Sequence, residues 1–442
     1  MQISVGMVSL GCVKNQVDAE MLMAQLEKDG FILKDDAAMA DVAIVNTCGF
    51  IDSAKQEAVE EILELAKLKD EGRIKKIVVT GCLAERYKEE IHNELPEIDA
   101  VVGIGGNSEI GKVILEMMDT GFVQSFPDKT NMPLCGERVL STPSYFAYIK
   151  IAEGCDNCCT YCAIPSIRGG FRSRTIESIE EEAKMLAENG AKEIILIAQD
   201  TTRYGMDIYG EYSLAKLLKR LAKIESIHWI RTLYCYPEAI TDELLDVMAS
   251  EEKVVKYLDL PLQHADGKVL KRMNRQGDRA SLTALISKIR STVPGVTLRT
   301  TFIVGFPGEI EENFTELAEF VKEIRFDRMG CFAYSQEDGT PAATMPEQID
   351  DEVKMRRAEI LMQNQMDIMQ EKGEAMIGQK IEVLTEAFDR YAECWFGRSS
   401  MDAPDVDGKI FFSVKDKKPT LGEIVQVEIT DCIDCDLFGE MI

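Results

Sequence analysis

Histidine is scarce in this sequence of 442 residues, which holds only His92, His228 and His264. Because general-base catalysis and zinc sites both draw heavily on imidazole, chemistry built on histidine clusters has little to work with here. Long apolar runs are also missing, and none reaches the roughly 20 residues that a membrane-spanning helix requires. We therefore expect a protein without a membrane-spanning segment, whose chemistry depends on other side chains.

Positive charge is in short supply as well. The chain carries 50 Lys and Arg against 77 Asp and Glu, a net charge of −27. A stable complex with free nucleic acid needs a basic surface and is not expected. The acidity suits a basic partner, and it fits a role in solubility alone equally well. The first residues, MQISVGMVSLGC, show no basic leader or cleavage site, so we expect a cytoplasmic protein whose 13 cysteines are reduced thiols or metal ligands.

Three of these cysteines lie in one short segment. Cys155, Cys159 and Cys162 have the spacing C-x-x-x-C-x-x-C and follow a predicted strand at 145–151. Three thiolates on one loop can hold three irons of a cubane cluster and leave the fourth iron without a protein ligand. Zinc is the alternative, but a structural zinc site normally closes with four ligands. Disulfides between cysteines crowded on one loop would be strained. The spacing therefore favours an iron–sulfur site.

The first third of the chain repeats one unit of a strand, a cysteine and a helix. Strands are predicted at 3–10, 41–45, 76–79 and 100–104, and the first three are followed by Cys12, Cys48 and Cys82. Strands that alternate with helices form parallel sheets, in which the carboxyl ends of the strands make the ligand crevice. We expect the three cysteines to meet there as a second iron–sulfur site. Three buried structural cysteines are the alternative.

These patterns predict an α/β protein of three parts. Residues 1–119 form a parallel-sheet α/β domain, and 120–140, with little periodicity, form a linker. Residues 141–372 contain six βα repeats and form a partial (β/α)6 barrel with its active site at the carboxyl ends of the strands. Residues 373–442 form a small β-barrel. Positions 374–442 hold 7 basic and 15 acidic residues, so this barrel is expected to contact protein or a basic surface rather than bare RNA.

Several polar residues follow the predicted central strands or the cysteine loop. The basic segment 167–174 fits a clamp for a carboxylate or phosphate, and it equally fits a solvated turn. A glycine-rich turn at 305–308 would let the backbone approach a ligand closely. Cys135 and the pair Cys432 and Cys435 are interpreted as incidental. Candidate substrate contacts in these segments are Arg168, Arg172, Asp200, Arg203, Gln263 and His264.

The cysteine loop, with Tyr161 before its last cysteine, resembles the signature of radical S-adenosylmethionine enzymes. Together with the three N-terminal cysteines and a final barrel that resembles a TRAM domain, it makes the whole chain similar to the methylthiotransferase family. The phrases SLGCVKNQVDAE, NTCGFIDSAKQE, LIAQDTTRYG and DLPLQH resemble the RimO group, which modifies a ribosomal protein. A sister group modifies tRNA adenosine. Cys158 stands where a basic residue is more usual in the motif.

The resemblance implies two [4Fe-4S] clusters, one on each set of three cysteines, and S-adenosylmethionine as both radical source and methyl donor. It implies transfer of a methylthio group to the β-carbon of an aspartate in protein twelve of the small ribosomal subunit, with electrons from an external donor. The alternatives are tRNA modification and a non-enzymatic iron–sulfur carrier. The positions that would line the S-adenosylmethionine site are Tyr161, Gln199, Ile303, Gly305 and Glu309.

Overall fold

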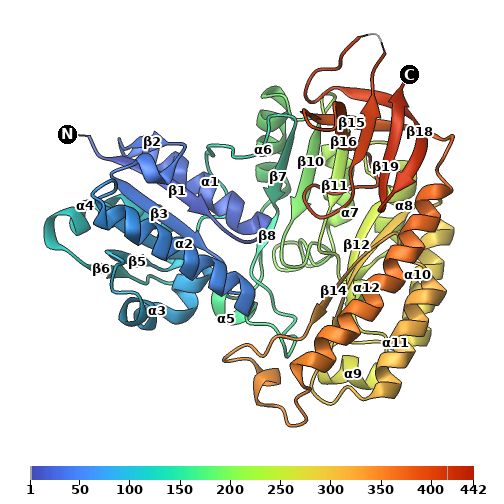
Figure 1. Ribbon diagram of the computed structural model, residues 1–442, viewed down its shortest axis with the longest axis horizontal. Helices are drawn as coiled ribbons and strands as arrows, with labels where there is room; N and C mark the ends of the chain where they lie inside the picture. Colours follow the sequence, from blue (N-terminus) through green and yellow to red (C-terminus); the bar gives the residue numbers. More distant parts are fainter. Residues whose placement is uncertain (1, 416) are drawn as a thin grey trace.

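A six-stranded parallel sheet forms the N-terminal part of the computed structural model, which describes residues 2–415 and 417–442. The strand order is β2-β1-β3-β4-β5-β6 (Figure 1). The strands are β1 Ser4–Ser9, β2 Ile32–Lys34, β3 Val42–Thr47, β4 Lys76–Gly81, β5 Ala100–Val102 and β6 Val123–Ser125. The helices are α1 Val13–Lys28, α2 Asp52–Asp70, α3 Cys82–Glu94 and α4 Ile110–Thr120.

Both faces of this sheet are covered by helices. Side chains of α2 and α3 share one apolar core with Ala43 and Val45 of β3. Side chains of α1 and α4 share a second core with Val42 and Ile44 of the same strand. A strand buried on both faces must be apolar throughout, which is why β3 reads as a continuous hydrophobic run rather than an alternating one.

The structure corrects the predicted linker at one point. Residues 123–125 form β6 and pair in parallel with β5, so the N-terminal sheet continues past residue 119 into the segment expected to be irregular. Strands β2 and β6 are both edge strands of three residues. A period of two cannot be recognised in so short a run, which explains why the sequence pattern missed them.

The barrel of the central part is built from six strands in two three-stranded parallel sheets, ordered β11-β10-β7 and β12-β13-β14, and β8 (Ala152–Glu153) pairs separately with β9 (Arg172–Ser173). A parallel bridge joins Ile230 of β11 to Val254 just before β12, and the N–H of Cys235 donates to the carbonyl of Asp259 in β12. The resulting open barrel confirms the predicted fold. The strands are β7 Phe146–Lys150, β10 Glu193–Ile197, β11 Trp229–Thr232, β12 Tyr257–Gln263, β13 Thr297–Val304 and β14 Arg328–Ala333. The main helices are α6 Ile176–Glu188, α7 Leu214–Leu221, α8 Asp242–Ser250, α9 Gly267–Arg272, α10 Arg279–Thr292, α11 Glu311–Ile324 and α12 Asp351–Glu374.

The C-terminal part is a closed five-stranded barrel in the order β15-β16-β17-β19-β18, as predicted. Its strands are β15 Lys380–Asp389, β16 Cys394–Arg398, β17 Ile410–Ser413, β18 Ile424–Ile433 and β19 Asp436–Met441. It contacts the beginnings of the central strands, where Arg398 lies 2.8 Å from Glu193 and Arg231 donates to the carbonyl of Ser400 (Figure 1). The C-terminal barrel therefore does not cover the carboxyl ends of those strands, where the cysteine loop lies.

Within the described residues, no helix combines the length and apolar character needed to cross a membrane.

Candidate functional site

The three N-terminal cysteines follow three strands that are neighbours in the sheet. Cys12 follows β1, Cys48 follows β3 and Cys82 begins the helix after β4. Glycines allow these strand ends to approach one another. A Cβ on Gly11 would lie 2.5 Å from Cβ of Cys48, and one on Gly81 would lie 2.5 Å from the carbonyl oxygen of Thr47. The φ of Gly11 is +90° and that of Gly81 is +94°, in a region that favours glycine. A larger residue therefore does not fit at either position between the strand ends.

The pKa values of the two buried thiols, Cys48 and Cys82, are raised, so these thiols would lose their protons only on binding metal. Burial, opposed by Arg168 and aided by the nearby Cys12 and Cys48, raises the pKa of Cys82 to about 11. Burial also raises the pKa of Cys48. Free thiols in such a place stay protonated, whereas a bound cation would release their protons. Arg168 donates to Sγ of Cys82 over 3.2 Å and so favours negative charge on that sulfur.

The second set of cysteines lies on the loop after β7 and β8 (Ala152–Glu153). The backbone N–H of Cys155 donates to the carbonyl of Gly169, and that of Cys162 donates to the carbonyl of Cys159. The Cys159 sulfur lies 2.7 Å from the Tyr236 hydroxyl. Burial raises the pKa of Cys155 to about 11 and that of Cys162 to about 12. The loop is thus folded tightly around three largely shielded thiols.

Cys158, the additional thiol of this loop, differs from its neighbours. Its side chain is exposed and its φ is +52°. Its carbonyl accepts a hydrogen bond from Asn274, which fixes the turn. Exposure alone does not exclude a ligand, since Cys12 is exposed as well. Cys155, Cys159 and Cys162 are more shielded than Cys158 and have the predicted spacing, so they stay the predicted ligands of this loop.

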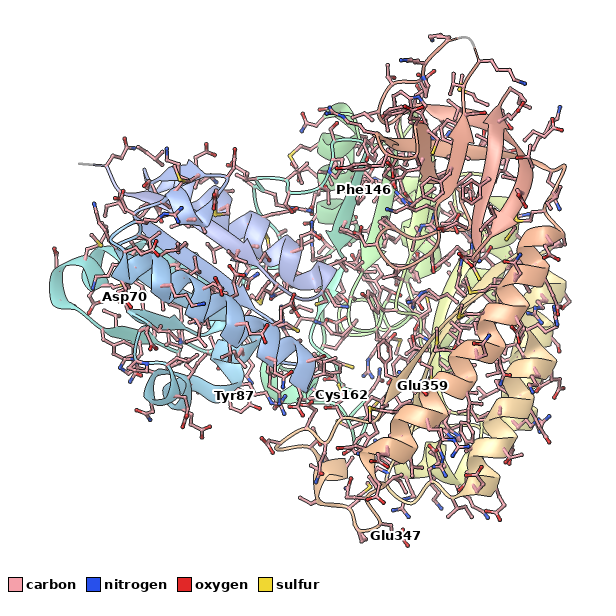
Figure 2. All side chains as sticks on the ribbon, in the orientation of Figure 1. Asp70, Tyr87, Phe146, Cys162, Glu347 and Glu359 are labelled. Atoms are coloured by element: carbon pink, nitrogen blue, oxygen red, sulfur yellow. The ribbon has the colours of Figure 1, made fainter. Side chains whose placement is uncertain are left out.

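The two sets of cysteines adjoin each other. Cys82 packs against Ala163, which follows Cys162 directly, and against Ile167 of α5 (Ile164–Arg168). Figure 2 shows Cys162 at the boundary between the N-terminal and central parts. Among the described residues, no three His, Cys, Asp or Glu side chains converge tightly enough for a single metal ion. A cubane is larger than one ion and holds its thiolates farther apart, so the assignment of both sets to clusters stays a prediction.

Two amides at the rim of the central barrel carry oxygens without a protein partner. Gln199 follows β10 and donates to Glu153 over 2.6 Å, which orients the amide. Its other end, Oε1, is buried and unpaired, as is Oε1 of Gln263 at the end of β12. Gln263 also has φ of +69°. Buried acceptors without partners call for a donor from elsewhere, and S-adenosylmethionine supplies several, so the residues present fit this cofactor.

The remaining positions predicted for S-adenosylmethionine lie on one side of the same rim. Tyr161 and Ile303 pack against a small core that contains Phe306. Glu309 is buried, and it accepts hydrogen bonds from the N–H groups of Gly305 and Phe306 and from Arg357. In the structure Glu309 therefore stabilises the turn at 305–308. Contact between Glu309 and the cofactor stays a prediction.

The six candidate substrate residues do not form one surface. Arg168, Asp200 and His264 are buried, and Asp200 accepts hydrogen bonds from Asn157 and Thr202. Arg172 donates to the carbonyl of Thr130. Arg203 forms an ion pair of 3.5 Å with Asp156. Three of the six, Arg172, Gln263 and His264, each have a buried side-chain atom without a hydrogen-bond partner. Their contact with substrate stays a prediction.

The sequence analysis missed a buried ionic network that joins the two sets of cysteines. Lys150 forms ion pairs with Asp18 and Glu153, and Arg168 does the same, at 2.5 Å to Asp18 and 3.3 Å to Glu153. Burial opposes ionisation of Glu153, but Lys150 and Arg168 lower its pKa to about 2. The chain Gln199–Glu153–Arg168–Cys82 thus runs from the barrel rim to the N-terminal thiols. The signals in the sequence are an acidic residue two positions before Cys155 and the basic segment 167–174, which contains Arg168.

Known families match each part of this arrangement. Residues 149–321 match the radical SAM superfamily, residues 377–442 match the TRAM domain, and residues 4–103 match a family described as uncharacterized protein family UPF0004. The fold is similar to that of a radical S-adenosylmethionine methyltransferase, TsrM from Kitasatospora setae, with a TM-score of 0.58 and 16% identity over 77% of each chain. The protein is therefore of the radical S-adenosylmethionine class.

Its relatives define the family more narrowly. The chain is 49% identical to "Ribosomal protein uS12 methylthiotransferase RimO" of Desulforamulus reducens over 99% of both chains. It is 46% identical to the protein of the same name from Clostridioides difficile, over 100% of this chain and 99% of the relative. The chain belongs to the RimO family.

Proposed function

We propose that this protein transfers a methylthio group to the β-carbon of an aspartate in ribosomal protein uS12. The observation that carries the proposal is the juxtaposition of two three-cysteine sets at Cys82 and Ala163, in a chain whose relatives bear the name of that activity over their full length. The cysteines Cys12, Cys48, Cys82, Cys155, Cys159 and Cys162 would hold two [4Fe-4S] clusters.

The bound clusters and S-adenosylmethionine would supply the radical and the sulfur, chemistry that no side chain of the protein can provide. A hydrogen on a carbon next to a carboxylate is far too weakly acidic for removal by a general base. The protein's own residues position the thiols and the polar groups around the cofactors and shield them from water. The Tyr236 hydroxyl holds Cys159, Glu153 orients the Gln199 amide, and the close-packed glycines bring the N-terminal thiols together.

The proposed parts are an N-terminal methylthiotransferase domain at 1–119, a linker at 120–140 whose residues 123–125 add β6 to the N-terminal sheet, a radical S-adenosylmethionine core at 141–372 and a TRAM-like barrel at 373–442. The proposed setting is the cytoplasm, with uS12 as the macromolecular partner and an external electron donor. A basic ribosomal protein suits the net charge of −27, whereas a lasting complex with free nucleic acid does not.

The proposal is tested with anaerobically reconstituted protein, S-adenosylmethionine, a reductant and uS12. Mass spectrometry is expected to show the methylthio group on aspartate, together with 5′-deoxyadenosine. Cys159→Ala should abolish 5′-deoxyadenosine formation but keep the iron of the N-terminal site. Cys48→Ala should keep 5′-deoxyadenosine formation and block sulfur transfer.

Two results would contradict the proposal. Modification of tRNA adenosine, with uS12 unmodified, would show that the protein is a tRNA methylthiotransferase instead. Iron and sulfide without any cleavage of S-adenosylmethionine would make it an iron–sulfur carrier.

A further inference from the structure

Lys14 is a buried cation without a carboxylate partner, and the groups beside it that can carry negative charge are Cys12 and Tyr234. Its exposed fraction is 9%, yet among the side chains that the structure describes no carboxylate forms an ion pair with it. The other buried cations of this region differ. Lys150 and Arg168 share Asp18 and Glu153, and Arg138 pairs with Glu20. An ammonium taken out of water without a counter-charge is costly, so one unpaired cation in a region of paired ones needs an explanation.

The position of Lys14 places it between the two candidate cluster sites. It belongs to the first turn of α1, two residues after Cys12. Its ammonium lies 3.2 Å from the ring centroid of Tyr234, which follows β11 at the rim of the central barrel. One side chain therefore spans from the N-terminal thiol loop to the rim that carries Gln199.

Tyr234 is itself held in an unusual conformation. Its φ is +60°, which is uncommon for a residue with a bulky side chain. Its N–H donates to Asp259, and its carbonyl accepts from the N–H of Thr201. Strain of this kind persists where the surroundings fix it, often at ligand sites. The ring face compensates the ammonium only in part, since a cation–π contact is weaker than an ion pair with a buried carboxylate.

We propose that Lys14, supported by Tyr234, binds the carboxylate of the target aspartate. This rests on the proposed function. An aspartate side chain has its β-carbon next to the carboxylate, so holding the carboxylate here would fix that carbon at the junction of the two sites. S-adenosylmethionine also carries a carboxylate, so binding of the cofactor is measured beside binding of the peptides. Recognition of a carboxylate also selects a protein substrate over an adenine ring.

The test is equilibrium binding of two peptides to the reconstituted holoenzyme under anaerobic conditions. One peptide carries the uS12 segment with its aspartate, and the other carries asparagine at that place. A charge-assisted hydrogen bond should make the wild-type protein favour the aspartate peptide by about tenfold or more. Lys14→Met should reduce this preference to near unity, and Lys14→Arg should retain part of it. Lys28→Met is the matched control, because Lys28 is an exposed residue at the end of the same helix and should leave the preference unchanged.

Several outcomes would overturn the assignment of Lys14. One is a full preference for the aspartate peptide in Lys14→Met, and another is no preference in the wild type. A third is an unchanged preference in Lys14→Met together with weaker binding of S-adenosylmethionine, which would assign Lys14 to the cofactor. Weaker binding of an RNA oligonucleotide with no effect on the peptides would also overturn it. If Lys14→Met fails to take up iron, Lys14→Gln serves in its place. A wild type that prefers the aspartate peptide but never methylthiolates it would reject the proposed function and leave the Lys14 assignment standing.

Discussion

Replacing Arg168 by methionine should loosen the contact between the N-terminal and central parts. The guanidinium is 2% exposed and bonds to Asp18, Glu153, Asn15 and the Cys82 sulfur. Methionine preserves much of the length but none of the charge. Asp18 and Glu153 would then share the single cation of Lys150, and the buried set would change from neutral to a net charge of −1.

Breaking a buried ion pair by removing one partner typically costs about 3–5 kcal/mol, because a charge is left uncompensated. Lys150 continues to contact both carboxylates, so we expect the lower end, about 3 kcal/mol. The loss falls on local opening of α1 against α5 rather than on the whole chain, since a protein of several parts need not unfold in one step. Amide hydrogen exchange in residues 13–28 and 164–168 measures this opening free energy.

Arg138→Met is the matched control. Arg138 is equally buried and also crosses between the two parts, with bonds to Glu20, Glu182 and the carbonyl of Tyr148, but it contacts no thiol. Both variants should speed exchange. Only Arg168→Met should also lower the midpoint potential of the N-terminal centre, because hydrogen bonds to cluster sulfurs raise reduction potentials. Equal potentials in the two variants, or unchanged exchange in Arg168→Met, would refute the role given to this network.

Three further outcomes are expected. Burial raises the pKa of Glu193, but Arg398 and Arg231 lower it on balance. Its stabilising contribution is therefore fully present above the unfolded value of about 4.3 and is lost progressively as pH falls from there through the lower folded value. The urea concentration at the midpoint of unfolding should therefore be lower at pH 3.5 than at pH 6. The decrease should be smaller in Glu193→Gln than in the wild type. Gln199→Ala should weaken S-adenosylmethionine binding about fivefold, the effect of one neutral hydrogen bond, measured by calorimetry. Cys158→Ser should leave the iron content unchanged by elemental analysis, since the thiol is exposed.

The arrangement of cysteines could be predicted because it depends on local order along the chain. Each N-terminal cysteine comes directly after a strand, and parallel strands gather their carboxyl ends at one edge. The structure places Cys12, Cys48 and Cys82 at three neighbouring strand ends, as expected. Edge strands β2 and β6 escaped prediction because three residues carry no usable periodicity.

The ionic network could not be predicted, because its members are far apart in the sequence and only tertiary packing pairs them. The basic segment 167–174 shows this best. It was open to interpretation as an anion clamp or as a solvated turn, yet Arg168 and Arg174 are both buried in ion pairs with the protein's own carboxylates. Composition gives the number of charges, but not which of them face one another. For the same reason Lys14 attracts no notice until its surroundings are known.

Charge acts on two length scales in this protein, and salt should separate them. The net charge of −27 can attract a basic ribosomal protein from a distance, but at physiological ionic strength such attraction is screened within about 8 Å. The contact proposed for Lys14 is buried, where salt screens little. Raising salt should therefore weaken the affinity for both peptides together and slow their association, while the ratio between aspartate and asparagine peptides stays nearly constant. A ratio that falls in parallel with the affinity would mean that the aspartate is recognised by the surface field and not by a buried cation.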